Sequence, residues 1–189
     1  MITVTHQFTC RQIQRPLCRS AADNPGSFLL SFHFTITCLQ YSNILTMSIE
    51  PLRQFFSARV YAVVGASPDP TKYGNKVLKW YIDHKLPATG INPREVVIYG
   101  VQSLSSVSAL LNQSGAEHIS VSVITPPRVS EVLLNEINEL GDKVKGVWFQ
   151  PGSFDDATLD AARDGLNIIA GGRCVLVEGE NGLRAVANL

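Results

Sequence analysis

Cysteine is scarce in this chain and is concentrated at one end. The 189 residues include four cysteines: Cys10, Cys18 and Cys38 fall in the first 46 residues, and Cys174 stands alone in the remainder. The sequence has no CxxC pair and no group of cysteines and histidines at the spacing of a zinc site. These absences argue against a disulfide framework and a structural zinc, and they favour a reducing compartment.

The chain also lacks an excess of charge of either sign and a long apolar run. Sixteen lysines and arginines balance sixteen acids, so we expect no broad basic surface for nucleic acid, and local charge must hold any anionic ligand. The most apolar segment, residues 28–45, carries His33, Gln40 and Asn43 and is too polar for a membrane span. A hydrophobic fraction of 45% is enough for one α/β domain with its own core.

Composition changes near residue 47. Residues 1–46 contain three arginines against the single acid Asp23 and are rich in Thr, Ser and Gln, which is typical of a mitochondrial transit peptide. A disordered tail, or a translation start at Met47, accounts for the same composition. We therefore expect residues 1–46 to be a targeting or disordered segment that the mature protein need not contain. Residues 47–189 are the expected folded domain, located in the mitochondrial matrix or the cytoplasm.

From Met47 onward, short apolar runs alternate with amphipathic segments. The expected strands are 60–64, 88–92, 119–124, 144–149 and 166–170, with one weak strand within 96–104 and an extended piece at 174–177 before a polar tail. The expected helices are 49–56, 74–85, 105–113, 129–140 and one from a cap at Ser153 to residue 164. This alternation predicts a Rossmann-like α/β fold: a doubly wound parallel sheet of five to six strands in three αβα layers.

The most informative segment follows the first expected strand. Gly65-Ala66-Ser67 permits a tight turn that a ligand can approach closely, and Lys72 adds a positive charge before a helix that begins near Tyr73-Gly74. The free N–H groups at the start of such a helix attract a phosphate. The segment is neither GxGxxG nor a Walker loop, because Ala66-Ser67 replaces the second glycine and no GK[ST] follows. The alternative interpretation is a structural turn with a solvated lysine.

A second candidate site follows the strand expected at 88–92. NAD-binding domains usually place an acid here for the ribose hydroxyls, whereas this strand ends in Asn92-Pro93-Arg94. A cation at this point suits a ligand with a phosphate on its ribose, and both NADP and coenzyme A have one. The alternative is a plain Asn-Pro turn with an exposed pair formed by Arg94 and Glu95.

The remaining strands bring further residues to the same edge, because ligands of open parallel sheets bind past the carboxyl ends of the strands. Thr125-Pro126-Pro127 offers a rigid apolar wall for an adenine ring or a pantetheine arm, or simply begins the next helix. Gln150 and Gly152 follow the strand at 144–149. Gly171-Gly172-Arg173-Cys174 follows the last strand with flexible backbone, a cation and a thiol.

Four of these motifs, in this order, resemble a known family. Val63–Gly74, Ile91–Pro93, Val147–Gly152 and Gly171–Cys174 look like the small single-domain CoA-binding proteins. That family is similar to the N-terminal CoA-binding domain of the succinyl-CoA synthetase α subunit. The resemblance implies a Rossmann-like domain that binds coenzyme A. It places the CoA phosphates at residues 65–67, Lys72 and Tyr73, the adenosine near residues 92–94, and the adenine or the arm near residues 125–127.

No catalytic constellation is evident in residues 47–189. His84 falls at the end of an expected helix, where a cation favours the helix dipole, and His118 falls at the opposite, amino edge of the sheet. Cys174 would need a stabilised thiolate to act as a nucleophile, and a buried inert cysteine is the alternative. We therefore expect no metal site, and a protein that holds coenzyme A or an acyl-CoA without chemistry.

Two other functions stay open from the sequence. An NADP-dependent oxidoreductase is compatible with Arg94. A Rossmann-like scaffold that binds a protein partner and no nucleotide is compatible with the fold alone. For a CoA-binding protein and for an NADP-dependent oxidoreductase, the expected partner is a small nucleotide ligand. The sequence leaves the oligomeric state and the acyl group open.

Overall fold

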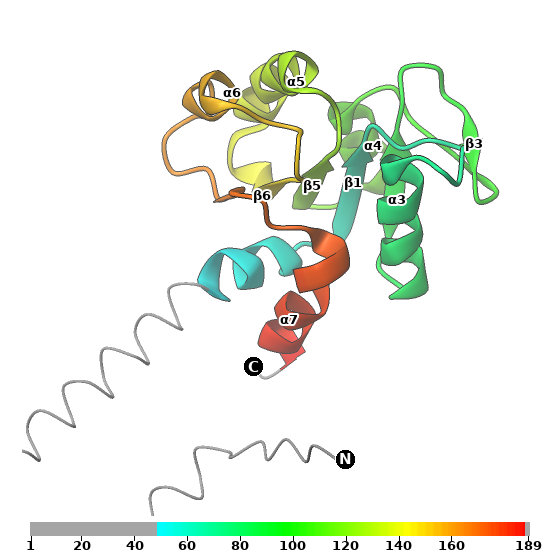
Figure 1. Cartoon of the computed structure of the whole chain (residues 1–189), viewed down its shortest axis with the longest axis horizontal. Helices are drawn as coiled ribbons and strands as arrows, with labels where there is room; N and C mark the ends of the chain where they lie inside the picture. Colours follow the sequence, from blue (N-terminus) through cyan, green and yellow to red (C-terminus); the bar gives the residue numbers. More distant parts are fainter. Residues whose placement is uncertain (1–48, 188–189) are drawn as a thin grey trace, which may run out of the picture. The chain divides into compact units, whose positions relative to one another are not determined.

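Residues 49–187, which a computed structural model of the chain describes, form a five-stranded parallel sheet flanked by helices (Figure 1). The strands are β1 (Val60–Val64), β2 (Ala88–Ile91), β5 (Ile119–Val123), β6 (Val144–Phe149) and β7 (Ile168–Ile169). Neighbouring strands are parallel throughout, in the order β2-β1-β5-β6-β7. The predicted Rossmann-like fold is confirmed, and its sheet has five strands where five to six were expected.

The order of the strands creates one point at which the direction of winding reverses. The chain starts with β1, moves outward to β2, and then crosses back over β1 to β5. The last residue of β1, Val64, pairs with Ile91 of β2 on one side and with Val123 of β5 on the other. The loops after β1 and β5 therefore leave the sheet side by side at its carboxyl edge, where open α/β sheets bind ligands.

Helices cover both faces of the sheet, as the alternating sequence pattern predicts. α4 (Val107–Ser114), α5 (Pro127–Leu140) and α6 (Asp156–Asp160) pack on one face, with a 3-10 turn (Gly141–Lys143) after α5. The helical residues 49–56, α3 (Tyr73–Asp83) and α7 (Val175–Ala187) pack on the other face. Alternate residues of each strand supply the two cores: Val64 faces the first set of helices and Val63 faces the second.

Two buried serines interrupt the apolar pattern of β5, and both have hydrogen-bond partners. Ser120 Oγ donates to Phe55 O at 2.7 Å, which ties the strand to the helical residues 49–56. Ser122 Oγ lies 2.7 Å from the hydroxyl oxygen of Tyr81 in α3. Because these contacts satisfy the hydroxyl groups, the serines are accommodated within a core that is otherwise apolar.

Residues 96–104 contain a small β-hairpin rather than the single weak strand that the sequence suggests. β3 (Val97–Ile98) and β4 (Val101–Gln102) are antiparallel, and the turn between them is Tyr99-Gly100, with φ values of 51° and 78°. Two positive φ values give a hairpin turn that matches the twist of its strands. They are unusual for a residue with a large side chain.

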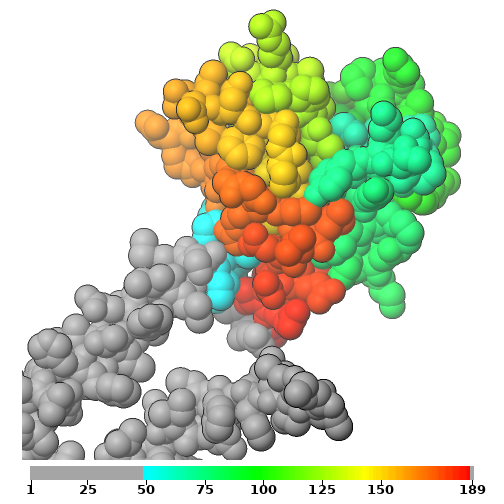
Figure 2. All heavy atoms as spheres, in the orientation of Figure 1, coloured from blue at the N-terminus to red at the C-terminus, as the bar shows by residue number. Residues whose placement is uncertain are grey.

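The C-terminal region differs from its prediction. The extended piece expected at 174–177 and the polar tail after it are wrong, because α7 occupies this region as a helix of 13 residues. Gly179 and Gly182, which disfavour a helix by propensity, lie where a Cβ would meet the rings of Trp80 and Phe56 at 2.3 and 2.4 Å. In Figure 2, α7 (red) lies between residues 49–56 (cyan) and α3 (green). Tertiary packing of the glycine face thus outweighs propensity.

The helix before β7 is shorter than expected and begins at a different cap. α6 ends at Asp160, and its N-cap is Asp155, whose carboxylate accepts a hydrogen bond from Thr158 N at 2.8 Å. Ser153, the expected cap, instead donates to Gln150 O. The hydrogen bonds from the hydroxyl and then the N–H of Thr158 lower the pKa of the Asp155 carboxyl.

The predicted targeting or disordered segment, residues 1–46, lies outside the described residues, and its proposed role and location stay predictions. Among residues 49–187, no helix combines the length and the apolar character that a membrane crossing requires.

Candidate functional site

A groove of about 690 Å³ lies at the carboxyl edge of the sheet, over the ends of β2, β1 and β5. Its lining also includes the loop after β1, the start of α4 and part of α5. The structure thus brings three separate loops together, as the sequence predicts. The predicted residues that line the groove are Gly65, Ala66, Ser67, Lys72, Tyr73, Gly74, Asn92, Pro93, Thr125 and Pro126.

The loop between β1 and α3 is compact because glycines allow close contacts within it. Gly65 has a φ of 89°, and a Cβ there would sit 3.2 Å from Thr125 Cγ2. A Cβ on Gly74 would come within 2.0 Å of Gly65 O. The first turn of α3 therefore lies directly on the backbone of the preceding turn, an arrangement that a side chain at position 74 would prevent.

Four backbone N–H groups of this loop have no hydrogen-bond acceptor within residues 49–187. They belong to Ala66 and Ser67 in the turn and to Tyr73 and Gly74 in the first turn of α3. All four residues line the groove, and the N-cap residue Lys72 supplies no side-chain cap. The free donors and the positive end of the α3 dipole make this part of the groove suited to an anion.

Two side-chain amides hold the carbonyl groups of the same turn. Asn92 Nδ2 donates to Ala66 O at 2.8 Å, and Asn75 Nδ2 donates to Ser67 O at 2.8 Å. The carbonyl of Ala66 and the N–H of Ser67 belong to one planar trans peptide and point in opposite directions. The Asn92 contact therefore also sets the direction of the free N–H of Ser67.

Lys72 and Glu136 carry the formal charges among the residues that line the groove. Glu136 Oε1 accepts hydrogen bonds from Ser108 N and Ser108 Oγ, both at 2.7 Å, so its carboxylate is engaged at the start of α4. Within the loop between β1 and α3, Asp69 accepts from the hydroxyl and the N–H of Thr71, and these bonds lower the pKa of Asp69. Lys72 is exposed, which leaves its ammonium group accessible to a ligand.

Tyr73 connects the groove to Cys174, which does not line it. The Tyr73 hydroxyl is hydrogen-bonded to the Cys174 thiol. Burial, and then this hydrogen bond, raises the pKa of Tyr73 above its ordinary value. Cys174 is half-buried and directly precedes α7. Its place in a cofactor site stays a prediction, supported by contact with one groove residue.

Four other predicted site residues, Arg94, Pro127, Gln150 and Gly152, are not part of the groove lining. Arg94 and Gly152 are exposed in turns, and Pro127 is the first residue of α5, as its helix-initiating interpretation predicts. Gln150 is fully buried, and its Oε1 accepts from Val175 N at 3.0 Å. Gln150 therefore connects the end of β6 to the start of α7.

The sequence does not predict the side of the groove that α4 and α5 provide. Ser105 and Ser106 line it, and Ser106 Oγ caps α4 by accepting from Ala109 N at 3.1 Å. Val129 and Val132 line it from α5 and are 51% and 68% exposed. Serines before an apolar helical run are a recognisable cap signal. The two valines carry no such signal, because exposed apolar residues are common on helices.

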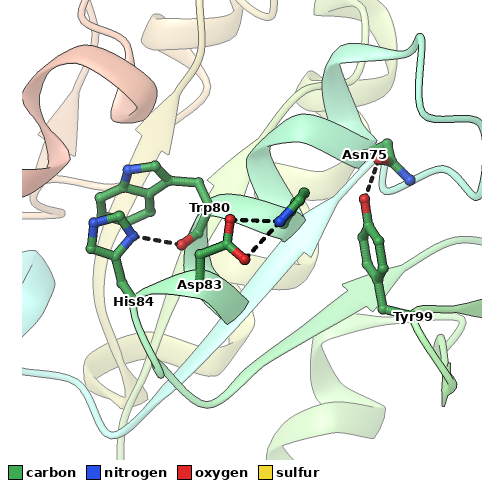
Figure 3. Close-up of polar contacts among 6 residues, drawn as sticks. Asn75, Trp80, Asp83, His84 and Tyr99 are labelled. Atoms are coloured by element: carbon green, nitrogen blue, oxygen red, sulfur yellow. Dashed lines mark hydrogen bonds and ion pairs between the residues drawn. The ribbon is translucent and has the colours of Figure 1, made fainter.

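The two histidines of residues 49–187 lie away from the groove. His84 follows α3, where its Nδ1 donates to Trp80 O at 2.7 Å and its ring stacks on the Trp80 ring, with centroids 4.1 Å apart (Figure 3). His118 precedes β5 at the amino edge of the sheet. In this part of the chain, no three or more His, Cys, Asp or Glu residues gather as a metal site would need.

The fold and the groove define the class of protein: a Rossmann-like domain with a candidate ligand site where the winding of its sheet reverses. The family described as a CoA binding domain matches residues 59–180. The chain belongs to this family, as its four motifs predict. The matched segment runs from β1 into α7 and contains every residue that lines the groove.

Solved structures of similar proteins share the fold. A hypothetical protein from Pyrococcus horikoshii is 27% identical with a TM-score of 0.60, over 71% of this chain and 91% of that one. A conserved hypothetical protein from Pyrococcus furiosus is 32% identical with a TM-score of 0.52, over 64% and 98% of the two chains. A protein from Thermus thermophilus is 23% identical with a TM-score of 0.58, over 68% of this chain and 93% of that one. The comparison with curated proteins gives no match.

Proposed function

We propose that the domain binds coenzyme A or an acyl-CoA in the groove, with the CoA phosphates on the loop between β1 and α3. One observation carries the proposal: four free N–H groups occur on one loop of the groove, at the start of a helix. A phosphate chain is the natural acceptor for such donors. Membership of the CoA-binding family favours coenzyme A as the ligand that carries this phosphate chain. Lys72 and the hydroxyl hydrogen of Ser67 supply further donors.

The rest of the groove suits the remainder of this ligand. Coenzyme A joins an anionic diphosphate to an adenosine at one end and a largely uncharged pantetheine arm at the other. The lining away from the donor loop is mainly apolar and includes Val64, Ile91, Ile124, Leu133, Pro93 and Pro126. Such a lining with a few placed polar groups is typical of small-molecule sites. Arg94, next to Pro93, stays the proposed contact for the 3′-phosphate.

The role that we propose is binding without catalysis, as in a carrier or a sensor. The titratable side chains that line the groove are Lys72, Tyr73 and Glu136. Ser108 donates two hydrogen bonds to Oε1 of Glu136, and the phenol of Tyr73, whose pKa is raised from an ordinary value that already lies above neutral pH, is protonated, so neither is a ready general base. Lys72 contributes a positive charge that suits phosphate.

Calorimetric titration of the purified chain with coenzyme A tests the proposal. Lys72→Ala should weaken CoA binding about tenfold or more, because a hydrogen bond from a charged group contributes roughly 1.5–3 kcal/mol. Lys76→Ala is the matched control, since Lys76 is exposed in the first turns of α3, the helix that follows Lys72, and does not line the groove. Its CoA affinity should equal that of the wild type. In thermal unfolding, CoA at 100 times its dissociation constant should add about 2.7 kcal/mol of stability.

A parallel titration with NADPH separates the alternatives. Tighter binding of NADPH than of CoA would overturn the CoA assignment. Binding of neither would favour a scaffold for a protein partner. If the wild type and Lys72→Ala bind CoA with equal affinity, Lys72 does not contact the phosphates, whereas the proposal that the domain binds CoA still holds. Mass spectrometry of the co-purified small molecule identifies the acyl group.

A further inference from the structure

Tyr99 has a backbone conformation that is uncommon for a large residue. It stands at the turn between β3 and β4 with a φ of 51°, in the left-handed region that normally favours glycine. Its side chain is 47% exposed, and it does not line the groove. Residues in such conformations persist where the surrounding structure holds them, and they cluster at functional sites. The contacts of Tyr99 therefore indicate what it does.

The Tyr99 side chain points toward Asn75 at the start of α3 (Figure 3). Its hydroxyl donates a hydrogen bond to Asn75 Oδ1. Asn75 is only 3% exposed, and the other end of its amide, Nδ2, donates to Ser67 O at 2.8 Å. Tyr99 is thus connected to the loop that carries the free N–H groups through one intervening side chain.

The Tyr99 hydroxyl anchors the Asn75 amide at the end opposite Ser67. An asparagine side chain has an acceptor at one end and donors at the other. The Ser67 carbonyl selects which end of the amide faces it, because a flipped amide would set Oδ1 against Ser67 O, and the hydroxyl bond to Oδ1 holds the side chain in that place. Loss of this control lowers the fraction of free protein whose loop is ready for a ligand. The apparent affinity then falls in proportion to that fraction.

We propose that Tyr99 is a positioning residue for the anion site. Through Asn75, it holds the Ser67 carbonyl and with it the loop that carries the free donors. The inference rests on the proposed function, because CoA affinity is its readout. It assigns control of binding to a residue that lies outside the groove, on a hairpin separate from the main sheet.

Titration of four proteins with CoA tests the role of Tyr99: the wild type, Tyr99→Phe, Asn75→Ala and the double variant. Tyr99→Phe keeps the ring and removes the hydroxyl. It should weaken CoA binding about threefold to tenfold, the range expected for one hydrogen bond. If Tyr99 acts through Asn75, the same substitution should cause no further loss in the Asn75→Ala background.

Tyr61→Phe is the matched control. The Tyr61 hydroxyl donates to Phe56 O at 3.1 Å and to Ala58 O at 2.9 Å, within the core and away from the groove. This variant should lose thermal stability and keep the wild-type affinity for CoA. The control separates an effect on the binding loop from a general loss of stability, since each variant removes one hydrogen-bonded phenol hydroxyl.

The outcomes distinguish this inference from the proposed function. Wild-type protein that does not bind CoA refutes the proposed function and the role of Tyr99 together. Unchanged affinity in Tyr99→Phe, or an equal loss in both backgrounds, overturns the role of Tyr99 and leaves the proposed function standing. A loss that disappears in the Asn75→Ala background supports the connection from Tyr99 to the loop.

Discussion

At the scale of single residues, position 74 shows how one missing side chain shapes the candidate site. An added Cβ would lie 2.0 Å from Gly65 O and 2.9 Å from Gly65 C. This close approach sets the first turn of α3, with the free N–H groups of Tyr73 and Gly74, against the turn that carries those of Ala66 and Ser67. The sequence predicts a phosphate loop here from Gly65 and Lys72. It does not reveal the need for Gly74, because the contact depends on the path of the folded chain.

Substitution of this glycine should separate the loop from the helix. Gly74→Ala should lower the free energy of unfolding by about 1–3 kcal/mol, the usual cost of inserting atoms into a packed site. It should also weaken CoA binding by more than tenfold, because the four donors lose their arrangement. Urea unfolding and calorimetric titration measure the two effects, with Lys76→Ala as the control on the same helix. A destabilised variant that binds CoA normally would show that the contact is not needed for binding.

At the scale of elements, α7 is the part of the fold that the sequence pattern does not predict. The strands β1, β2, β5 and β6 are predictable because each is an apolar run bounded by turn residues. In α7, Gly179 and Gly182 lower the helix propensity of the segment. Their small size is what allows Trp80 and Phe56 to pack against the helix. Local preference and tertiary packing oppose each other here, and only the folded structure shows which one prevails.

A helix-favouring substitution in α7 should therefore destabilise the protein. Gly182→Ala gains up to about 1 kcal/mol of helix propensity. It places a Cβ 2.4 and 2.5 Å from two ring atoms of Phe56, so we expect a net loss of about 1–3 kcal/mol in the free energy of unfolding. The loss should shrink in a Phe56→Leu background, which removes those ring atoms. Urea unfolding of both single variants and the double variant measures the coupling.

Val177→Ala provides the control for this experiment. Val177 is 77% exposed on the same helix, so alanine there should leave the free energy of unfolding unchanged or raise it slightly. If Gly182→Ala is as stable as the wild type, the glycine face of α7 is not closely packed against Phe56. Tertiary packing would then not be what overrides helix propensity in α7.

At the scale of the whole molecule, the order of the strands decides which predicted residues meet. Ten predicted residues line one groove because β2, β1 and β5 are adjacent. Gln150 and Gly152 follow β6, on the far side of β5, and do not line it. Their position at the carboxyl edge is predictable from the sequence, since each follows a strand. Their distance from the point where the winding reverses, between β1 and β5, is not predictable from the sequence, because strand order depends on how crossovers pack in three dimensions.

The buried tyrosines should make the whole domain sensitive to alkaline pH. Burial raises the pKa of Tyr61 from 10.0 to about 12 and also raises the pKa of Tyr81. A phenol with a raised pKa in the folded state ionises first in the unfolded chain. Its stabilising contribution is therefore complete below pH 10 and is lost as the pH rises toward 12. Between the pKa of the unfolded chain and that of the folded protein, each such tyrosine makes the free energy of unfolding fall by about 1.4 kcal/mol more per pH unit.

Tyr61→Phe isolates this effect because it removes one of the ionising groups. Below pH 10 the variant should be less stable than the wild type, since it lacks the hydrogen bonds to Phe56 O and Ala58 O. Above pH 10 the wild type should lose stability faster, so the two curves of unfolding free energy against pH should converge. Urea unfolding at several pH values between 8 and 12 measures both curves. Parallel curves across this range would mean that Tyr61 ionises equally readily in both states, and that the core around it does not exclude its charged form.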